Sequence, residues 1–226
     1  MMEAIYGSPF FGLTLCIGTF FFGTWVQKKT KMVLANPLLI AAAICLAVMG
    51  LLKIPYEQFE KGANIIHWML GPVTALLALG IYNQRAILKE YFIPVIVGCV
   101  VGCLTSMGSI LILCKVFHVD AVITASILPK SCTTPIAIGI AESRGGLAAI
   151  AVCGVMIAGL TGALFAPQFS KWFHITEPVA QGLATGASSH ALGTTKAREM
   201  GEIQGAMSSI AIGVCGLLSV ILSLFL

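Results

Sequence analysis

The chain has 226 residues, of which 58% are hydrophobic and only 10% are charged, and its formal net charge is +4 at pH 7. Soluble globular proteins carry about 25% charged residues, so this composition excludes a soluble enzyme, a secreted disulfide scaffold and a disordered protein. An integral membrane protein with little mass outside the bilayer remains.

Long stretches without Asp, Glu, Lys or Arg follow one another along the chain. In chain order they are 4–27, 32–52, 62–84, 91–114, 121–141 (interrupted by Lys130 alone), 145–170, 178–195 and 203–226. A helix needs about 20 apolar residues to cross the hydrocarbon core. Barrel strands would be shorter and would alternate apolar with polar residues. The pattern therefore predicts an all-α fold, a polytopic membrane helix bundle of about 7–8 segments, forming a single domain over residues 1–226.

Lysine and arginine are distributed unequally between the two sides of such a bundle. With eight crossings, the side that holds the loop at 27–32 carries eight of them and the opposite side carries four. The positive-inside rule then predicts that this loop is cytoplasmic and that both chain ends lie outside. The start of the chain carries Glu3 and no basic residue, so we expect a retained helix there and no cleaved signal peptide. No basic run suggests a nucleic-acid partner.

The eight cysteines lie almost entirely in apolar stretches: Cys16, Cys45, Cys99, Cys103, Cys114, Cys132, Cys153 and Cys215. In such surroundings Cys behaves as a small hydrophobe. Their spacing resembles neither a metal site nor a disulfide framework. We expect no metal, no cofactor and no structural disulfide.

Three of the stretches contain residues that interrupt helices: Gly71 and Pro72 in the third, Pro129 and Pro135 in the one with Lys130, and Gly186 and Gly193 in the seventh. A proline inside a helix removes a backbone donor and clashes with the preceding turn. Pro129 and Pro135 should therefore divide their segment into two halves. Unpaired backbone groups in hydrocarbon cost several kcal/mol each, so such breaks occur near midplane only where protein or a wet cavity surrounds them.

The break between the two prolines holds Lys130, Ser131, Thr133 and Thr134. Lys130 lies near the centre of its segment, where a lysine costs roughly 2.5–3.5 kcal/mol on insertion scales. An anionic ligand is one partner that would offset this cost. A carboxylate such as Glu142, or a carbonyl, is the alternative, with a role only in helix packing. The hydroxyls could likewise bind a ligand or merely cap the broken helix.

The seventh stretch is polar but uncharged, with Ser188, Ser189, His190, Thr194 and Thr195. His190 either contacts a substrate or carries a proton, or it donates one hydrogen bond to a backbone carbonyl. Adjacent residues on a helix point about 100° apart, so the serines and His190 are poorly placed as a nucleophile–base pair. No catalytic motif is present, and we expect no enzyme. Ser219, on an otherwise apolar last helix, is expected to lie outside any site.

Three motifs carry a resemblance to a known family: Pro-Lys-Ser-Cys-Thr-Thr-Pro-Ile-Ala at 129–137, Ala-Ser-Ser-His-Ala-Leu-Gly-Thr-Thr-Lys-Ala-Arg-Glu at 187–199, and Leu-Gly-Pro-Val-Thr-Ala at 70–75. With these the sequence resembles the LrgB/CidB family, the antiholin-like membrane proteins of bacteria. It is also similar to the LrgB-like part of the plant plastidial glycolate/glycerate translocator. Cys132 stands where the family pattern leads us to expect valine.

The resemblance implies a multi-pass protein of the bacterial cytoplasmic (inner) membrane, with a small LrgA-type membrane protein as partner. It implies one of two functions. The first is transport of small monocarboxylates such as glycolate, glycerate or pyruvate. The alternative is antiholin-like regulation of murein hydrolase activity and autolysis, or a structural subunit of a holin-like complex. The first fits the residues better, because a holin-like pore needs no preorganised polar site. The partners expected are a small anion, the lipid bilayer and further copies of the chain.

Overall fold

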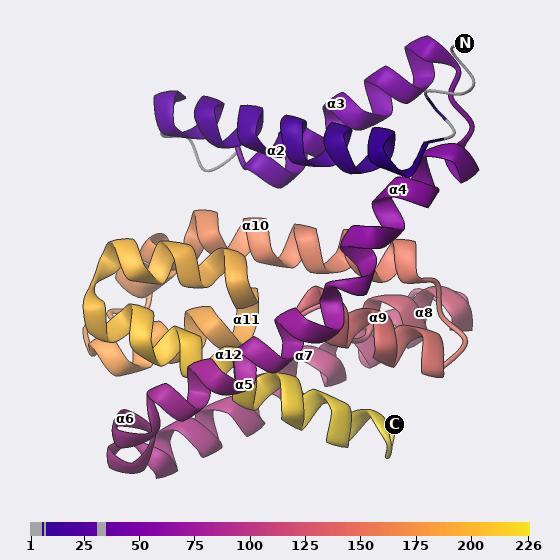
Figure 1. Cartoon of the computed structure of the whole chain (residues 1–226). Helices are drawn as coiled ribbons and strands as arrows, with labels where there is room; N and C mark the ends of the chain where they lie inside the picture. Colours follow the sequence, from indigo (N-terminus) through magenta and orange to yellow (C-terminus); the bar gives the residue numbers. More distant parts are fainter. Residues whose placement is uncertain (1–5, 7, 31–34) are drawn as a thin grey trace. The chain divides into compact units, whose positions relative to one another are not determined.

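The computed structural model describes Tyr6 and residues 8–30 and 35–226. The described residues form helices joined by short connections, without a strand among them (Figure 1). Four of these helices are long and apolar enough to cross a membrane: α2 (Pro9–Thr30), α7 (Phe92–Val116), α10 (Ala148–Trp172) and α12 (Glu202–Ser223). A shorter apolar helix is α3 (Pro37–Leu52). The prediction of an all-α, multi-pass membrane protein is confirmed. Glu3 and the last two residues of the loop at 27–32, both used in the sequence analysis, lie outside the described residues.

The chain divides into two compact units, Met1–Val73 and Thr74–Leu226. In the first unit α2 packs against both α3 and α4 (Tyr56–Trp68). The start of α3 follows from its sequence: the Asn36 side chain accepts a hydrogen bond from Leu38 N at 2.9 Å, and Pro37 occupies the first helical position. Such a cap satisfies one of the free N–H groups at a helix start. The family resemblance runs through both units, and a single domain over residues 1–226 stays a prediction.

The stretch at 62–84 is divided between two helices. Helix α4 ends at Trp68 and α5 (Leu70–Asn83) begins after Met69, followed by α6 (Arg85–Glu90). The interruption therefore falls just before Gly71 and Pro72 and not at them. Pro72 lies in the first turn of α5, where a missing N–H removes no hydrogen bond within the helix.

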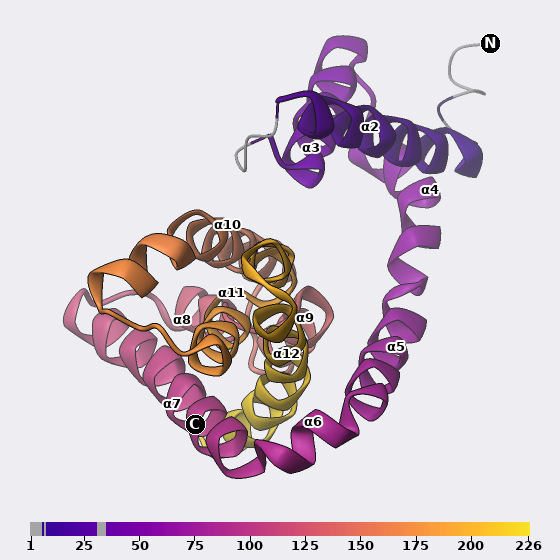
Figure 2. The ribbon, with the colours of Figure 1, turned by 90° about the vertical axis from the view of Figure 1, so that its left-hand side faces the viewer.

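The second unit contains α7, two short helices α8 (Ala121–Ile127) and α9 (Thr134–Ser143), then α10, α11 (Pro178–Met200) and α12. The short helices lie among the long ones (Figure 2): α8 contacts α7 and α10, and α9 contacts α10 and α12. One apolar core joins α7, α11 and α12. A smaller one joins the segment after α8, and α9, to Val155 of α10. The two short helices divide the stretch at 121–141 and place the chain between them inside the unit.

The orientation is tested by single cysteines in a Cys-free variant. Thr30→Cys and Ser143→Cys should react with a membrane-impermeant maleimide only from the cytoplasmic side, because both adjoin the more basic loops. Thr176→Cys, in the connection between α10 and α11, should react only from outside. Labelling of Thr176→Cys from the cytoplasm would mean that one stretch counted as spanning is re-entrant. A probe near Gly7 would fall outside the described residues.

Candidate functional site

The helix break between α8 and α9 covers Leu128–Thr133. Helix α8 ends at Ile127, and α9 begins with Thr133 as its N-cap and Pro135 in its first turn. Pro135 is tolerated there because the first N–H groups of a helix have no partner within the helix. Pro129 is fully buried in the break itself. The free N–H groups and the positive dipole end of α9 consequently lie inside the protein, an arrangement that suits an anion.

Lys130 lies in this break and is bonded to hydroxyls. Its Nζ donates to Ser131 Oγ at 3.4 Å and to Ser106 Oγ of α7 at 3.4 Å. The two serine hydroxyls are joined to each other at 2.8 Å. We call Lys130, Ser131 and Ser106 the break cluster. It joins the interrupted helix to α7.

No carboxylate among the described residues pairs with Lys130. The ion pair that those residues form joins Lys196 to Glu199 at 2.8 Å in α11. Glu142 is exposed and lies at the far end of α9. The alternative in which Glu142 neutralises Lys130 therefore does not describe this structure.

The break cluster has more hydrogen-bond donors than acceptors. An ammonium has three donors and no acceptor, and a hydroxyl has one donor and two acceptor sites. Two ammonium protons point to the two serines, and one hydroxyl proton lies between the serines. One ammonium proton and one hydroxyl proton have no acceptor within the cluster. A ligand with only acceptor atoms, such as a carboxylate, would complete the cluster.

Thr133 adds an unsatisfied group to the break. Its Oγ1 is buried and has no hydrogen-bond partner in the structure, although threonine at an N-cap often accepts from the helix N–H groups. An unpaired buried polar atom costs about 1–3 kcal/mol. Thr134, the next residue, is half-buried. The orphan hydroxyl of Thr133 at the start of α9 is a second feature of the break that a polar ligand would satisfy.

A small cavity adjoins the break cluster. It has a volume of about 10 Å³ and is lined by Ser131 and Cys132 of the break, Ser106 and Met107 of α7, Ala187 of α11 and Ser219 of α12. This volume is near the lower limit for one water molecule, so the structure is closed to any organic anion. Ser219 is buried at the cavity wall, where its Oγ donates to Cys103 Sγ at 3.6 Å. We expected Ser219 to lie outside any site, but α12 turns this polar residue inward, to the wall of this cavity.

The second polar segment is one helix, α11, with a kink. The non-helical residue is His190, with φ 39° and ψ −132°. Gly186 and Gly193 are both within helical turns, so the prediction that they break the helix is wrong. A Cβ on Gly186 would overlap the carbonyl oxygen of Ser208 in α12, and one on Gly193 would lie 2.5 Å from Ser189 Cβ. Gly186 permits close contact between helices, and Gly193 permits close packing across the kink.

The buried His190 ring bonds to the backbone of α10. Its Nε2 lies 3.0 Å from the carbonyl oxygen of Val155, a contact that requires a proton on Nε2. This is the simpler of the two roles considered for His190. Thr194 Oγ1 donates to the His190 carbonyl oxygen at 2.9 Å and shares a 2.7 Å bond with Ser208 Oγ. These contacts hold the kink between α10 and α12.

The serines of this segment make no hydrogen bond to the His190 ring. Ser188 is exposed and lies 2.9 Å from the hydroxyl of the buried Ser189. Thr195 is exposed and donates to Ala191 O at 3.3 Å. The described residues thus show no Ser–His pair of the kind that an intramembrane protease would need.

Helix α10 contacts both polar segments. A Cβ on Gly154 would lie 3.6 Å from Lys130 Cβ, and the next residue, Val155, accepts the bond from His190. The break cluster and the His190 kink therefore meet the same turn of α10 without a hydrogen bond between them. Sequence reasoning missed Ser106 and Ser208, because an isolated hydroxyl in an apolar stretch is common in membrane helices.

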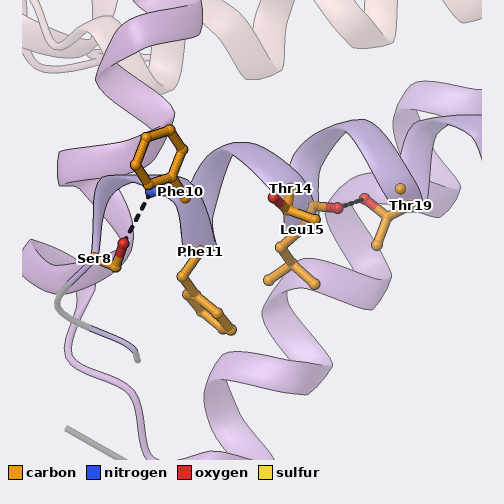
Figure 3. Close-up of a pocket in the computed structure, with 7 residues that line it drawn as sticks. Ser8, Phe10, Phe11, Thr14, Leu15 and Thr19 are labelled. Carbon is orange, nitrogen blue, oxygen red and sulfur yellow. Dashed lines mark hydrogen bonds between the residues drawn. The ribbon is translucent and has the colours of Figure 1, made fainter. Parts of the chain in front are cut away.

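A larger hollow lies along α2, in the first unit (Figure 3). Its volume is about 720 Å³, and it is lined by Ser8 and by α2 residues such as Phe10, Phe11 and Leu15. It is open and apolar, and its hydroxyls bond locally: Ser8 Oγ accepts from Phe10 N at 3.4 Å, and Thr19 Oγ1 donates to Leu15 O at 2.7 Å. In a bilayer such a surface faces acyl chains, so we do not assign a polar ligand to it.

Comparison with known proteins decides the family. A family model described as the LrgB-like family matches residues 16–226. The chain belongs to the LrgB-like family. The residues of the break and of the kink, on which the resemblance rested, are all within the matched range.

Named LrgB-like relatives cover nearly the whole chain. The antiholin-like protein LrgB of Bacillus subtilis (strain 168) is 34% identical over 215 residues, 95% of this chain and 93% of the relative. The antiholin-like protein LrgB of Bacillus mycoides is 33% identical over 95% of this chain and 94% of the relative. The protein YxaC of B. subtilis is 38% identical over 193 residues, which are 85% of this chain and 84% of the relative. No solved structure matches the chain at a significant level.

Proposed function

We propose that this LrgB-family protein carries small monocarboxylates across the bacterial cytoplasmic membrane and binds them at the α8–α9 break. The observation that carries the proposal is Lys130, whose ammonium bonds to hydroxyls and pairs with no carboxylate among the described residues. Intramembrane ionisable residues mark substrate pathways by default. A bound carboxylate would supply the missing countercharge.

The surroundings of Lys130 favour a small anion over a cation or an apolar ligand. The break cluster has donors left over, the start of α9 has free N–H groups, and Thr133 Oγ1 has no partner. Broken helices whose N-terminal ends meet an anion are the usual binding arrangement of secondary transporters. Ser131, Thr133 and Thr134 are the further candidate ligands from the break. Ser188, Ser189, His190, Thr194 and Thr195 belong to the kink, which we assign a supporting role.

The closed cavity defines what a transport cycle would require. A volume of about 10 Å³ holds no carboxylic acid. The substrate can enter only if the break moves away from α7 or α12. Alternating access by motion of one group of helices against another produces such an opening. On this proposal, the closed break is one step of that cycle.

Counterflow in liposomes tests the proposal. The purified protein is reconstituted with internal unlabelled glycolate, glycerate or pyruvate, and uptake of the labelled acid is followed. A carrier gives saturable uptake that needs the internal acid. Flux that rises linearly with concentration, admits solutes by size and collapses the membrane potential would contradict a carrier and identify a holin-type lesion. The measurement is repeated with an LrgA-type protein in the same liposomes, because such a subunit is a proposed partner.

The names of the relatives favour a second function. Two of them are called antiholin-like, so a regulatory role in murein hydrolase activity and autolysis is the competing proposal for this chain. Deletion and complementation separate the two. If Lys130→Met restores normal autolysis as well as the unchanged chain does, regulation does not depend on anion binding. If it fails although the protein reaches the membrane, both functions rest on the same site.

Thr133 gives a prediction with opposite effects on stability and binding. Thr133→Val removes an unpaired buried oxygen while keeping the shape, so the empty protein should be as stable as before or up to about 1–3 kcal/mol more stable. If Oγ1 contacts the bound acid, affinity should fall by roughly 1–3 kcal/mol, up to about 100-fold. Thermal unfolding and counterflow measure the two effects.

The control for Thr133 is Thr161→Val. Thr161 is exposed on α10 and donates to its own helix at Ile157 O, 2.7 Å away. Its replacement should leave counterflow unchanged. Ser219→Ala is unsuitable as a silent control, since Ser219 lines the cavity. Unaltered affinity in Thr133→Val would remove Thr133 from the site.

A further inference from the structure

One wall of the anion site comes from a helix that carries none of the sequence motifs. Ser106 is half-buried on α7 and bonds both to Lys130 Nζ at 3.4 Å and to Ser131 Oγ at 2.8 Å. Of the two hydroxyls bonded to Lys130, it is the one from outside the break. The neighbouring Ser109 is exposed and donates to the Ser106 carbonyl oxygen at 2.9 Å. Only one of these two serines therefore faces the break.

The hydroxyl of Ser106 has bonding capacity that the closed structure does not use fully. A serine hydroxyl donates one hydrogen bond and accepts two. Ser106 accepts from Lys130 and shares a single bond with Ser131. A ligand oxygen that enters the cavity can replace Ser131 as its partner. Ser106 and Ser131 line the same cavity. The Ser106 hydroxyl can therefore change its partner from Ser131 to a ligand oxygen without a shift of Ser106 along α7.

The cavity next to Ser106 has both polar and apolar lining. Ser106, Ser131 and Ser219 supply hydroxyls, while Met107 and Leu128 offer carbon and sulfur surface. A bound acid would therefore place its oxygens toward the cluster and its carbon chain toward Met107 and Leu128. Because Lys130 Nζ and Ser106 Oγ are only 3.4 Å apart, one ligand contacts both if it carries acceptor oxygens on the same or on adjacent carbons.

We propose that Ser106 binds the oxygen on carbon 2 of the transported acid, while Lys130 and the start of α9 bind its carboxylate. This rests on the proposed carrier function. Ser106 is then the residue with which the site distinguishes a 2-hydroxy or 2-oxo acid from an unsubstituted one. A hydroxyl serves both kinds of acid, because it donates to an oxo group and can accept from a hydroxyl group. The opening of the Ser106–Ser131 bond accompanies substrate entry.

The test compares glycolate with acetate, which differ only in the oxygen on carbon 2. Half-saturation concentrations are measured by liposome counterflow for the unchanged chain, Ser106→Ala, Ser106→Cys and Ser109→Ala. The unchanged chain should bind glycolate about tenfold more tightly than acetate, the value of one good hydrogen bond. Ser106→Ala and Ser106→Cys should lose this preference through weaker glycolate binding alone. Ser109→Ala should retain it.

The outcomes separate the role of Ser106 from the carrier function. Acetate flux in each Ser106 variant reports that the protein is folded. Equal losses for glycolate and acetate would overturn the proposal and make Ser106 a residue that only orients Lys130. An unchanged glycolate preference in Ser106→Ala and Ser106→Cys would also overturn it. If the unchanged chain shows no saturable flux of either acid, the carrier function itself fails, and this is seen before any variant is compared.

Discussion

Replacement of Lys130 by methionine is expected to abolish carboxylate uptake while the protein still inserts and folds. Methionine keeps the length of the side chain and removes the ammonium that pairs with the substrate. Removal of one partner from a buried ion pair costs about 3–5 kcal/mol, so uptake at low substrate concentration should fall at least about 100-fold. Insertion should become easier, because the cost of a central lysine, roughly 2.5–3.5 kcal/mol, disappears. Counterflow in liposomes and the yield of monodisperse protein measure the two effects.

Two further variants make the Lys130 result specific. Lys130→Arg keeps the charge, but a planar guanidinium does not replace a compact ammonium between two serines. It should fold and transport with reduced affinity. Lys115→Met removes a charge from an exposed position in the last turn of α7 and should change nothing. Normal saturable uptake by well-expressed Lys130→Met would exclude substrate pairing. Loss of expression would show instead that Lys130 stabilises the fold.

The sequence was a reliable guide to the helices because the bilayer constrains them so strongly. Every charge-free stretch with described residues is mainly helical, since backbone groups in hydrocarbon must bond within their own segment. Pro129 and Pro135 were equally informative: the chain leaves helical structure after Ile127 and resumes it at Thr134. A proline lacks a backbone donor and clashes with the preceding turn, yet this does not break every helix, because α10 continues through Pro167.

The glycines and isolated hydroxyls could not be interpreted in the same way. Whether a glycine breaks a helix or allows another helix to approach depends on what lies opposite, and for Gly186 that is α12. Ser106 and Ser219 differ little in sequence context from Ser109, yet only those two line the cavity. The side of the helix on which a hydroxyl lies, and the partner it meets there, come from the packing of helices distant in sequence. For this reason the helix break was predictable from the sequence, whereas the cavity residues contributed by α7 and α12 were not.

Gly186 provides the strongest expected effect on stability. If this glycine weakened the helix, Gly186→Ala would stabilise the protein by up to about 1 kcal/mol, because alanine favours helices. The structure predicts the opposite sign. A Cβ at this position would overlap the Ser208 carbonyl oxygen and lie 2.8 Å from Ala211 Cβ. Backbone cannot move aside as a flexible side chain can, so overpacking should cost about 1–3 kcal/mol or more.

Gly139 is the matched control for this change. It lies within α9, and a Cβ there would meet nothing within 4 Å. Gly139→Ala should therefore keep or raise the midpoint of thermal unfolding in detergent, while Gly186→Ala lowers it. The pair separates the helix propensity of glycine from its packing role in one protein and one assay. Stabilisation by both substitutions would contradict close contact between α11 and α12 at Gly186. Because α11 and α12 hold the kink at His190 through Thr194 and Ser208, a loosened contact should also reduce transport, whereas Gly139→Ala should leave it intact.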